Sequence, residues 1–200
     1  MWYKLDANGN VTKETTTEYS DALKHRIEHA LLNAPFSGGL QMGVTWKKQL
    51  SLTMDWTFLA GVYSLNNDRY FLENNVSGGF MMLNRSKKLN NEWRDDLTDE
   101  EKAKVTAPKF DEQTVVDDRF LENSSFLRLK NIQLAYTFPK SVFGTQKVIT
   151  GAKVYVSARN LLTVTSKEYN GFDPETSAGG LTLNKFPNTR QFVGGIQLMF

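Results

Sequence analysis

The sequence contains no cysteine, two histidines and no apolar run of about 18 residues, the length that indicates a transmembrane helix. Without cysteine, disulfide bonds, thiolate metal sites and cysteine nucleophiles are excluded. The first ten residues lack the basic and apolar regions of a signal peptide, so for an exported protein we expect further sequence upstream. The net charge of +2, with no basic stretch rich in aromatics, gives no reason to expect nucleic acid as a partner.

Alternation of apolar and polar residues is the strongest pattern that is present. In residues 50–63 (LSLTMDWTFLAGVY) every even position is apolar, and the odd positions are mostly polar or small. A period of two predicts a strand with one apolar face. The pattern is long enough for a tilted membrane strand, which needs about 9–11 residues. Residues 39–47 alternate in the same way, and only KKQ separates them from the next strand, so we expect a hairpin.

Three further strands are predicted later in the chain, in residues 125–138, 152–164 and 190–200. In the first of them the alternation fails near Arg128 and Lys130, which indicates a bulge or a strand end. In the second, Asn160 is the exception to the alternation. The long polar stretch between the second and third strands carries no strong strand pattern, and it has one plausible helix near residues 99–105.

The lengths of the connections predict the orientation of these five strands. They are in turn very short, very long, medium and long. Bacterial outer-membrane barrels have short periplasmic turns and long extracellular loops, which places Phe200 in the periplasm. Such barrels have an even number of strands, from about 8 upward, and an open sheet leaves unpaired edges in hydrocarbon. We therefore expect the chain to be the C-terminal piece of a larger barrel.

Three linked motifs carry a resemblance to a known family. DRFLENSSFLRLKNIQLAYTFP (118–139), KVYVSARNLLTVTSKEYNGFDPE (153–175) and FPNTRQFVGGIQLMF (186–200) occur in this order. Together they resemble the end of SusC/RagA-type TonB-dependent outer-membrane transporters. The segments ANGNVT and EYSDA, followed by the hairpin, are similar to the region that precedes those motifs in the family.

The resemblance implies an all-β fold, namely about the last five strands of a large plugged transmembrane β-barrel with long extracellular loops. It implies a position in the outer membrane and uptake of nutrients, oligosaccharides or peptides, rather than catalysis. The implied partners are the upstream strands and plug, a SusD-like surface lipoprotein, the barrel-assembly machinery, membrane lipid and the TonB complex, which acts through N-terminal parts that these residues do not include. Four segments are expected: an extracellular loop (1–37), a hairpin (38–63), a long extracellular loop (64–124) and the last three strands with their connections (125–200).

The resemblance also implies a role for the last strand. Phe200, with Leu198, Ile196 and Phe192 before it, resembles the signal that the barrel-assembly machinery reads. An aromatic end on a free strand edge can be recognised by strand addition. No cofactor, metal or catalytic residue is assigned. Aromatic residues in the loops are candidates for stacking on sugars: Trp2, Tyr3, Tyr70, Trp93, Tyr169, Phe172 and Phe186.

Two other functions are alternatives. The first is a soluble all-β carbohydrate-binding module, in which the apolar faces of the strands pack together. The second is a zinc peptidase built on HRIEH, with His25 and His29 as ligands on a helix that extends from Ser20 to Pro35, and Glu28 as the base. DANGNV resembles the start of a calcium loop but has Val11 where glycine is required, so Asn8-Gly9 predicts a turn instead.

Overall fold

Long antiparallel strands dominate the structure, a computed structural model that describes residues 2–16, 18–26, 31–73, 84–91, 93–105, 118–144, 148–176, 181–182 and 185–200. The chain divides into two units, Met1–Ala30 and Leu31–Phe200. Among the described residues, no helix combines the length and the apolar character needed to cross a membrane.

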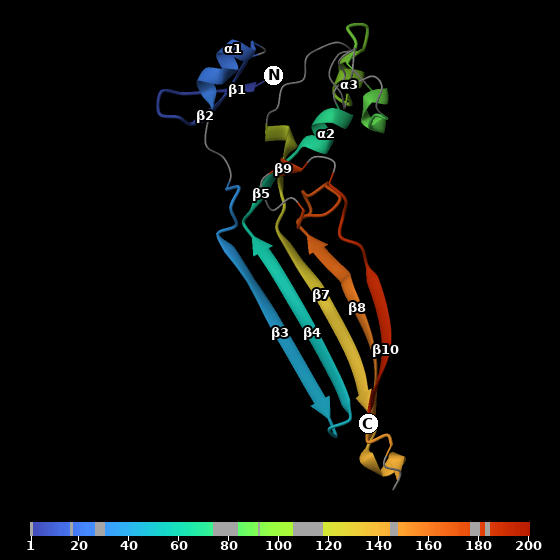
Figure 1. Ribbon diagram of the computed structural model, residues 1–200. Helices are drawn as coiled ribbons and strands as arrows, with labels where there is room; N and C mark the ends of the chain where they lie inside the picture. Colours follow the sequence, from blue (N-terminus) through green and yellow to red (C-terminus); the bar gives the residue numbers. More distant parts are fainter. Residues whose placement is uncertain are drawn as a thin grey trace. The chain divides into compact units, whose positions relative to one another are not determined.

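The larger unit is built on a five-stranded sheet whose strand order is β10-β8-β7-β4-β3. Within this sheet, each strand pairs antiparallel with the next member of the sheet along the chain, as Figure 1 shows. Consecutive pairing of this kind is the simple up-and-down arrangement that the alternating short and long connections predict. The strands are β3 (Phe36–Trp46), β4 (Leu50–Ala60), β7 (Phe126–Thr137), β8 (Gly151–Thr165) and β10 (Gln191–Met199).

The β3–β4 hairpin is confirmed. Its pairing is regular from Phe36 opposite Ala60 to Trp46 opposite Leu50. In the turn, Lys47 and Lys48 have positive φ angles of 50° and 59°, and the amide of Gln49 donates to the carbonyl of Trp46 at 3.0 Å. A tight hairpin turn needs such left-handed backbone so that its twist matches the twist of the strands.

The predicted bulge in β7 is confirmed at Lys130. The pairing of β7 with β4 and its pairing with β8 both shift register between Leu129 and Asn131, so Lys130 has no partner in either ladder. The extra residue changes which side chains face which way. Leu129 therefore joins the apolar face, and Arg128 lies on the polar face opposite Thr57.

The exception in β8 also has a structural reason. Asn160 has a φ of 53°, which Asn tolerates better than most residues, and it lies in the segment of β8 where the register with β7 shifts. Its side-chain amide donates to the carbonyl of Thr189 at 3.1 Å. The side chain of Asn160 therefore also binds the segment that directly precedes β10.

A second, three-stranded sheet lies at the other end of β4 from the hairpin turn (Figure 1). It consists of β5 (Tyr63–Asn66), β6 (Leu121–Asn123) and β9 (Leu181–Thr182). Residues 64–124, which carry no strong strand pattern in the sequence, nevertheless contribute most of β5 and all of β6. Both are too short, at four and three residues, for alternation to be visible in the sequence. Around them Val62 and Phe120 are almost fully buried.

Short helices complete this region. Helix α2 (Asn67–Leu72) follows β5 directly, with Asn66 as its N-cap. The predicted helix near residues 99–105 is present as α3 (Asp99–Lys102), where Thr98 and Glu101 form a capping box. It ends at Lys102, before the end of the predicted range. Three-residue and four-residue 3-10 helices occur at Lys87–Asn90, Asp118–Phe120 and Lys140–Phe143.

The smaller unit is a hairpin followed by a short helix. Strands β1 (Trp2–Leu5) and β2 (Val11–Thr16) pair antiparallel. The turn predicted at Asn8-Gly9 is confirmed, with Gly9 at a φ of 82°. Helix α1 (Tyr19–Ala22) and one 3-10 turn (Leu23–His25) follow. The predicted helix to Pro35 is wrong, because Arg26 is already extended, with a ψ of 138°.

Candidate functional site

One face of the five-stranded sheet is apolar and exposed. The even-numbered side chains of β3 and β4 lie opposite one another in register, and the pattern continues across β7, β8 and β10. Exposed members of this apolar face include Leu40 (56%), Val44 (66%), Leu134 (44%), Val156 (60%) and Ile196 (74%). So large an apolar surface on a folded protein marks a contact with lipid or with another protein. A soluble module that packs these faces together is therefore not what the described residues form.

The opposite face is polar. On it, the side-chain amide of Asn131 in β7 donates to Asp55 of β4 at 3.1 Å. The second carboxylate oxygen of Asp55 and the hydroxyl of Thr57 are buried and have no hydrogen-bond partner among the described residues. Buried polar atoms in proteins are normally satisfied, so these two are expected to meet water or further parts of a larger protein.

A cluster of charges connects the polar face to the loop between β8 and β10. The guanidinium of Arg128 donates to Asp173 at 2.5 Å and to Glu175 at 2.6 Å. Lys130, the bulged residue, pairs with the other oxygen of Glu175. The amide of Asn188 donates to Asp173 at 2.8 Å, and its side chain donates to Glu175 at 2.8 Å. This cluster, here called the loop anchor, holds residues 173–175 of the 166–190 connection against β7 and ties Asn188, near the end of that connection, to them.

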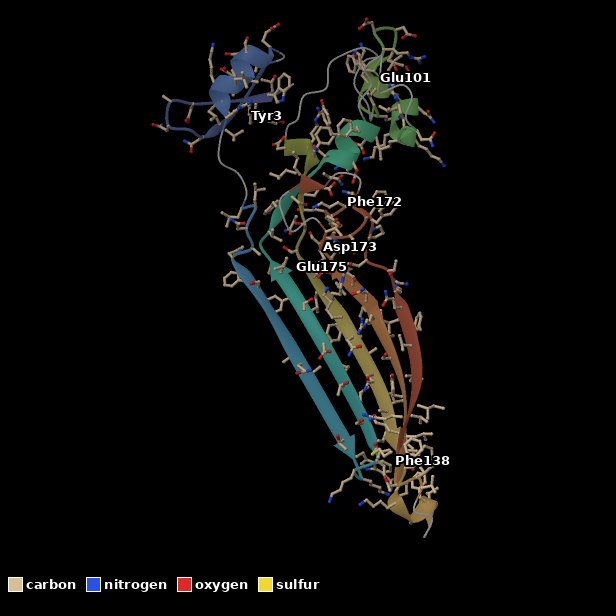
Figure 2. All side chains as sticks on the ribbon, in the orientation of Figure 1. Tyr3, Glu101, Phe138, Phe172, Asp173 and Glu175 are labelled. Carbon is tan, nitrogen blue, oxygen red and sulfur yellow. The ribbon has the colours of Figure 1, made fainter. Side chains whose placement is uncertain are left out.

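The electrostatics of the loop anchor follow from its burial. Arg128 and Asp173 are each 3% exposed. Burial opposes the ionisation of Asp173, but the hydrogen bonds from Arg128, Asn188 and Glu175 and the charge of Arg128 outweigh it. The pKa of Asp173 therefore lies below its ordinary value. Figure 2 shows Asp173 and Glu175 near the upper ends of the long strands.

A second ionic cluster holds α2 against β6. Arg69 donates to Glu122 at 2.7 Å and to Glu73 at 3.0 Å, and Lys88 pairs with Glu73 at 2.8 Å. Glu122 is buried, and it also accepts from the backbone amide of Asn170 at 3.0 Å. Burial raises the pKa of Glu73, but the two cations outweigh that effect and hold the pKa below its ordinary value. The two clusters thus attach the 166–190 connection to different strands.

A cavity of about 290 Å³ lies beside the loop anchor, between the upper part of β8 and the 166–190 connection. Arg128 and Asp173 lie in its wall, together with Thr163 and the exposed side chains of Phe172 and Arg190. Polar groups with an adjacent aromatic ring are what a small polar ligand needs for recognition. We take this loop-end cavity, with the loop anchor, as the candidate binding site.

The structure separates the aromatic residues proposed for sugar stacking. Tyr169 and Phe172 line the loop-end cavity. Tyr70 instead packs edge-on against Phe71 and Phe120, with ring centroids 5.3 and 5.6 Å apart. Trp93 and Phe186, which are 37% and 93% exposed, are not among the residues that line the cavity. Trp2 and Tyr3 belong to the smaller unit, where Tyr3 is 63% exposed. Phe172, itself 73% exposed, is therefore the best placed of the seven.

The residues of the predicted assembly signal lie together. Phe192, Ile196 and Leu198 pair with Ala158, Val154 and Ala152 of β8, on the apolar face. Phe200 follows the last strand residue, and its side chain is 80% exposed. Strand β10 has one neighbour, β8, among the described strands, so its other edge is free in them. The expected arrangement is thus present, and the role in assembly stays a prediction.

The zinc hypothesis has little support in the described residues. His25 is used structurally, because its Nδ1 accepts a hydrogen bond from the amide of Leu5 at 3.0 Å. Glu28 and His29 lie outside the described residues. No group of three or more histidine or acidic side chains in the described part of the chain is arranged to hold a metal. The helical segment ends at His25, so it does not continue to carry a second histidine on the same face.

The segment DANGNV (6–11), which resembles the start of a calcium loop, forms a turn that the side chain of Asp6 closes. One carboxylate oxygen of Asp6 accepts from the amides of Asn8 and Asn10 at 2.8 and 2.9 Å, and the other accepts from the side chain of Asn10 at 3.1 Å. These bonds from Asn10 and Asn8 lower the pKa of Asp6. The carboxylate thus completes a turn.

Sequence reasoning missed the loop anchor. In the sequence, Arg128 is visible only as a break in alternation, and Asp173 and Glu175 only as part of the motif FDPE. A charged residue that falls on the apolar face by simple parity was the available signal, because it requires either a bulge or a buried partner. The identity of that partner, 45 residues away, could not be read from spacing.

Comparisons with known proteins give relatives of one kind. No family model matches the chain. The chain is 29% identical over 201 residues to the TonB-dependent receptor SusC of Bacteroides thetaiotaomicron, covering 98% of the chain and 17% of the receptor. It is 33% identical over 96 residues to the TonB-dependent receptor P3 of Formosa agariphila, covering 42% of the chain and 9% of that receptor. The chain therefore spans less than a fifth of these relatives.

Solved structures give the same picture. The chain is similar to a structure of the RagAB peptide importer in the 'closed-closed' state, at 47% identity and a TM-score of 0.80, covering 98% of this chain and 21% of the matched chain. For the 'open-open' state of that importer the values are 41%, 0.77, 100% and 20%. These relatives are named as receptors and importers, not as enzymes. With the antiparallel sheet, they confirm the expected fold class, an all-β partial barrel.

Proposed function

Since the chain belongs to the SusC/RagA-type TonB-dependent transporters, we propose that it forms part of the wall of an outer-membrane barrel that imports a nutrient. The substrate class is peptides or oligosaccharides. Peptides are supported by the similarity to an importer named for them. The polar face borders the water-filled interior, and the apolar face contacts lipid.

The observation that carries this proposal is the exposed apolar face on strands of the right length. Strands β3 and β4 each have 11 residues. At about 3.3 Å per residue and a tilt of about 40°, each covers roughly 28 Å, close to the apolar band of about 25 Å in outer-membrane barrels. Burial of such a face in lipid would remove it from water, which is favourable.

The orientation follows from the two ends of the sheet. The short β3–β4 turn, the β7–β8 connection and Phe200 share one end, which we place in the periplasm. We place the other end of the sheet, with the loop anchor, outside, and we assign segments 1–37 and 64–124 to extracellular loops. Segments 38–63 and 125–200 then supply the strands of the wall and their connections.

The partners in this proposal are those of the larger transporter. Edge strands β3 and β10 pair with further strands, because open edges in hydrocarbon leave backbone groups without partners. A SusD-like lipoprotein covers the outer end, and the TonB complex supplies energy through other parts of the protein. Phe200, Leu198, Ile196 and Phe192 present the assembly signal to the barrel-assembly machinery.

Deletion and complementation of the whole transporter gene test this function. Uptake of fluorescently labelled peptide and oligosaccharide mixtures is measured in the parent strain, the deletion strain, the complemented strain and a strain without TonB. We expect the loss of uptake of one substrate class in the deletion strain and in the strain without TonB, with recovery on complementation. Equal uptake of both mixtures in all strains, or extraction of the protein from membranes by sodium carbonate, would contradict the proposal.

A further inference from the structure

The loop-end cavity has an arginine that the loop anchor does not use. The cavity lining contains two arginines, Arg128 and Arg190, and one carboxylate, Asp173. Arg128 is neutralised by Asp173 and Glu175. The structure gives Arg190 no ion pair with any described residue, and its side chain is exposed. The cavity therefore carries an uncompensated positive charge.

The position of Arg190 is set by the surrounding structure. It directly precedes β10, and the neighbouring Thr189 accepts the side-chain hydrogen bond of Asn160. Asn188, two residues earlier, is held by Asp173 and Glu175. The backbone that carries Arg190 is thus fixed on both sides, although its own side chain is exposed. A guanidinium on a fixed backbone can bind a carboxylate through two parallel hydrogen bonds.

We propose that the loop-end cavity is a carboxylate subsite of the transporter, in which Arg190 binds the anionic group of the substrate. This inference rests on the proposed function, because it assigns the substrate class of that transporter. Thr163 offers a hydroxyl in the cavity wall, and the exposed ring of Phe172 provides an apolar surface beside it. The volume of about 290 Å³ suits one residue or one sugar unit of a longer substrate.

Two kinds of substrate carry the required group. A peptide presents its C-terminal carboxylate, and an acidic oligosaccharide presents the carboxylate of a uronic acid. Four probes separate these sources: N-acetylated tetra-alanine, the same peptide with a C-terminal amide, trigalacturonic acid and its methyl ester. In each pair, only the first probe is charged, and the two members are otherwise close in size.

Binding of the four probes to the purified whole transporter is measured by calorimetry for the wild type, Arg190→Gln, Arg190→Lys and Arg94→Gln. Arg94 is an exposed arginine outside the cavity, paired with Asp96 at 3.7 Å. For Arg190→Gln we expect affinity for one charged probe to fall by about tenfold, the loss of one charge-assisted contact. Affinity for its neutral partner stays unchanged, Arg190→Lys retains part of the affinity, and Arg94→Gln behaves as wild type.

The charged probe that loses affinity identifies the source of the carboxylate. Equal affinity of wild type and Arg190→Gln for both charged probes overturns the subsite, as does an equal loss for a charged probe and its neutral partner. Absence of binding of all four probes to the wild type also overturns it. The proposed function is judged separately, by uptake in the deletion strain, so it stands if uptake still requires the gene.

Discussion

Nη2 of Arg128 lies 2.5 Å from Oδ1 of Asp173, and these two side chains are each 3% exposed although 45 positions separate them in the chain. The arginine comes from the bulged strand β7, and the aspartate comes from the connection between β8 and β10. Their pairing fixes the β8–β10 connection on the polar face of the sheet. It also builds one wall of the loop-end cavity.

Replacement of Asp173 by Asn should release this connection. The substitution keeps the shape of the side chain but leaves the buried guanidinium of Arg128 with Glu175 as its one remaining carboxylate partner among the described residues. We expect a loss of local stability of about 3 kcal/mol, at the lower end of the range for broken buried ion pairs. Hydrogen exchange of the backbone amides of residues 166–176 in the intact transporter measures this loss of local stability. Asp96→Asn is the matched control, because Asp96 is 75% exposed and should change exchange little. Equal exchange in both variants would show that the anchor does not hold the loop.

The same pair predicts a dependence on pH. The folded pKa of Asp173 lies below that of an unfolded aspartate, about 3.9. The stabilisation by ionised Asp173 is therefore fully present above about pH 4 and is lost as pH falls through the folded pKa. Exchange of residues 166–176 should be constant between about pH 7 and pH 5, after correction for intrinsic rates, and should rise below about pH 4. Asp173→Asn should remove this rise, and a rise of the same size in that variant would contradict the assignment.

The facing of the strands can be tested with arginine substitutions in β4. The sequence suggests Phe58 or Trp56 for the lipid side and Thr57 for the interior. In the structure Phe58 is near the end of β4, and Thr57 lies opposite Arg128, where a second arginine would be repelled. Met54 and Thr53, at the middle of the strand, are better choices, since Thr53 pairs with Gln133 and Gly43.

Met54→Arg should therefore cost about 2–4 kcal/mol of transporter stability, the value for a lipid-facing arginine at the bilayer midplane. Phe58→Arg should cost less, because it lies closer to the interface. Thr53→Arg should be mild, since its side chain enters a polar interior. Chemical unfolding in detergent-free vesicles measures all three. Equal losses for Met54→Arg and Thr53→Arg would refute the assigned faces.

Removal of Phe200 should impair assembly more than transport. Phe200 directly follows β10, which has one free edge among the described strands, and its side chain is 80% exposed. Its loss therefore removes few contacts within this part of the chain. We expect a smaller fraction of the transporter to reach the membrane in folded form, with normal activity per folded molecule. Heat-modifiable mobility on gels measures the folded fraction. Gln197→Ala, on the polar side of β10, is the control and should assemble normally. Normal assembly without Phe200 would remove it from the signal.

The strands were predictable because their information is local. Alternation over 50–63 specifies which side chains share a face. A shift of the strand register by one residue would move every one of these side chains to the opposite face of the sheet. The short KKQ turn then makes β3 and β4 antiparallel neighbours. The small strands β5 and β6 were not predictable, since four and three residues carry no period and their pairing joins segments that are distant in sequence.

By itself, the sequence determined the long strands, their two faces and the end at which Phe200 lies, because these depend on period and on connection length. Only the tertiary structure decided that Lys130 is skipped in the ladder, so that Arg128 turns to the polar face and meets Asp173. It also placed Arg190 at the loop-end cavity. Such contacts between distant segments depend on the path of a connection, which has no signature in neighbouring residues.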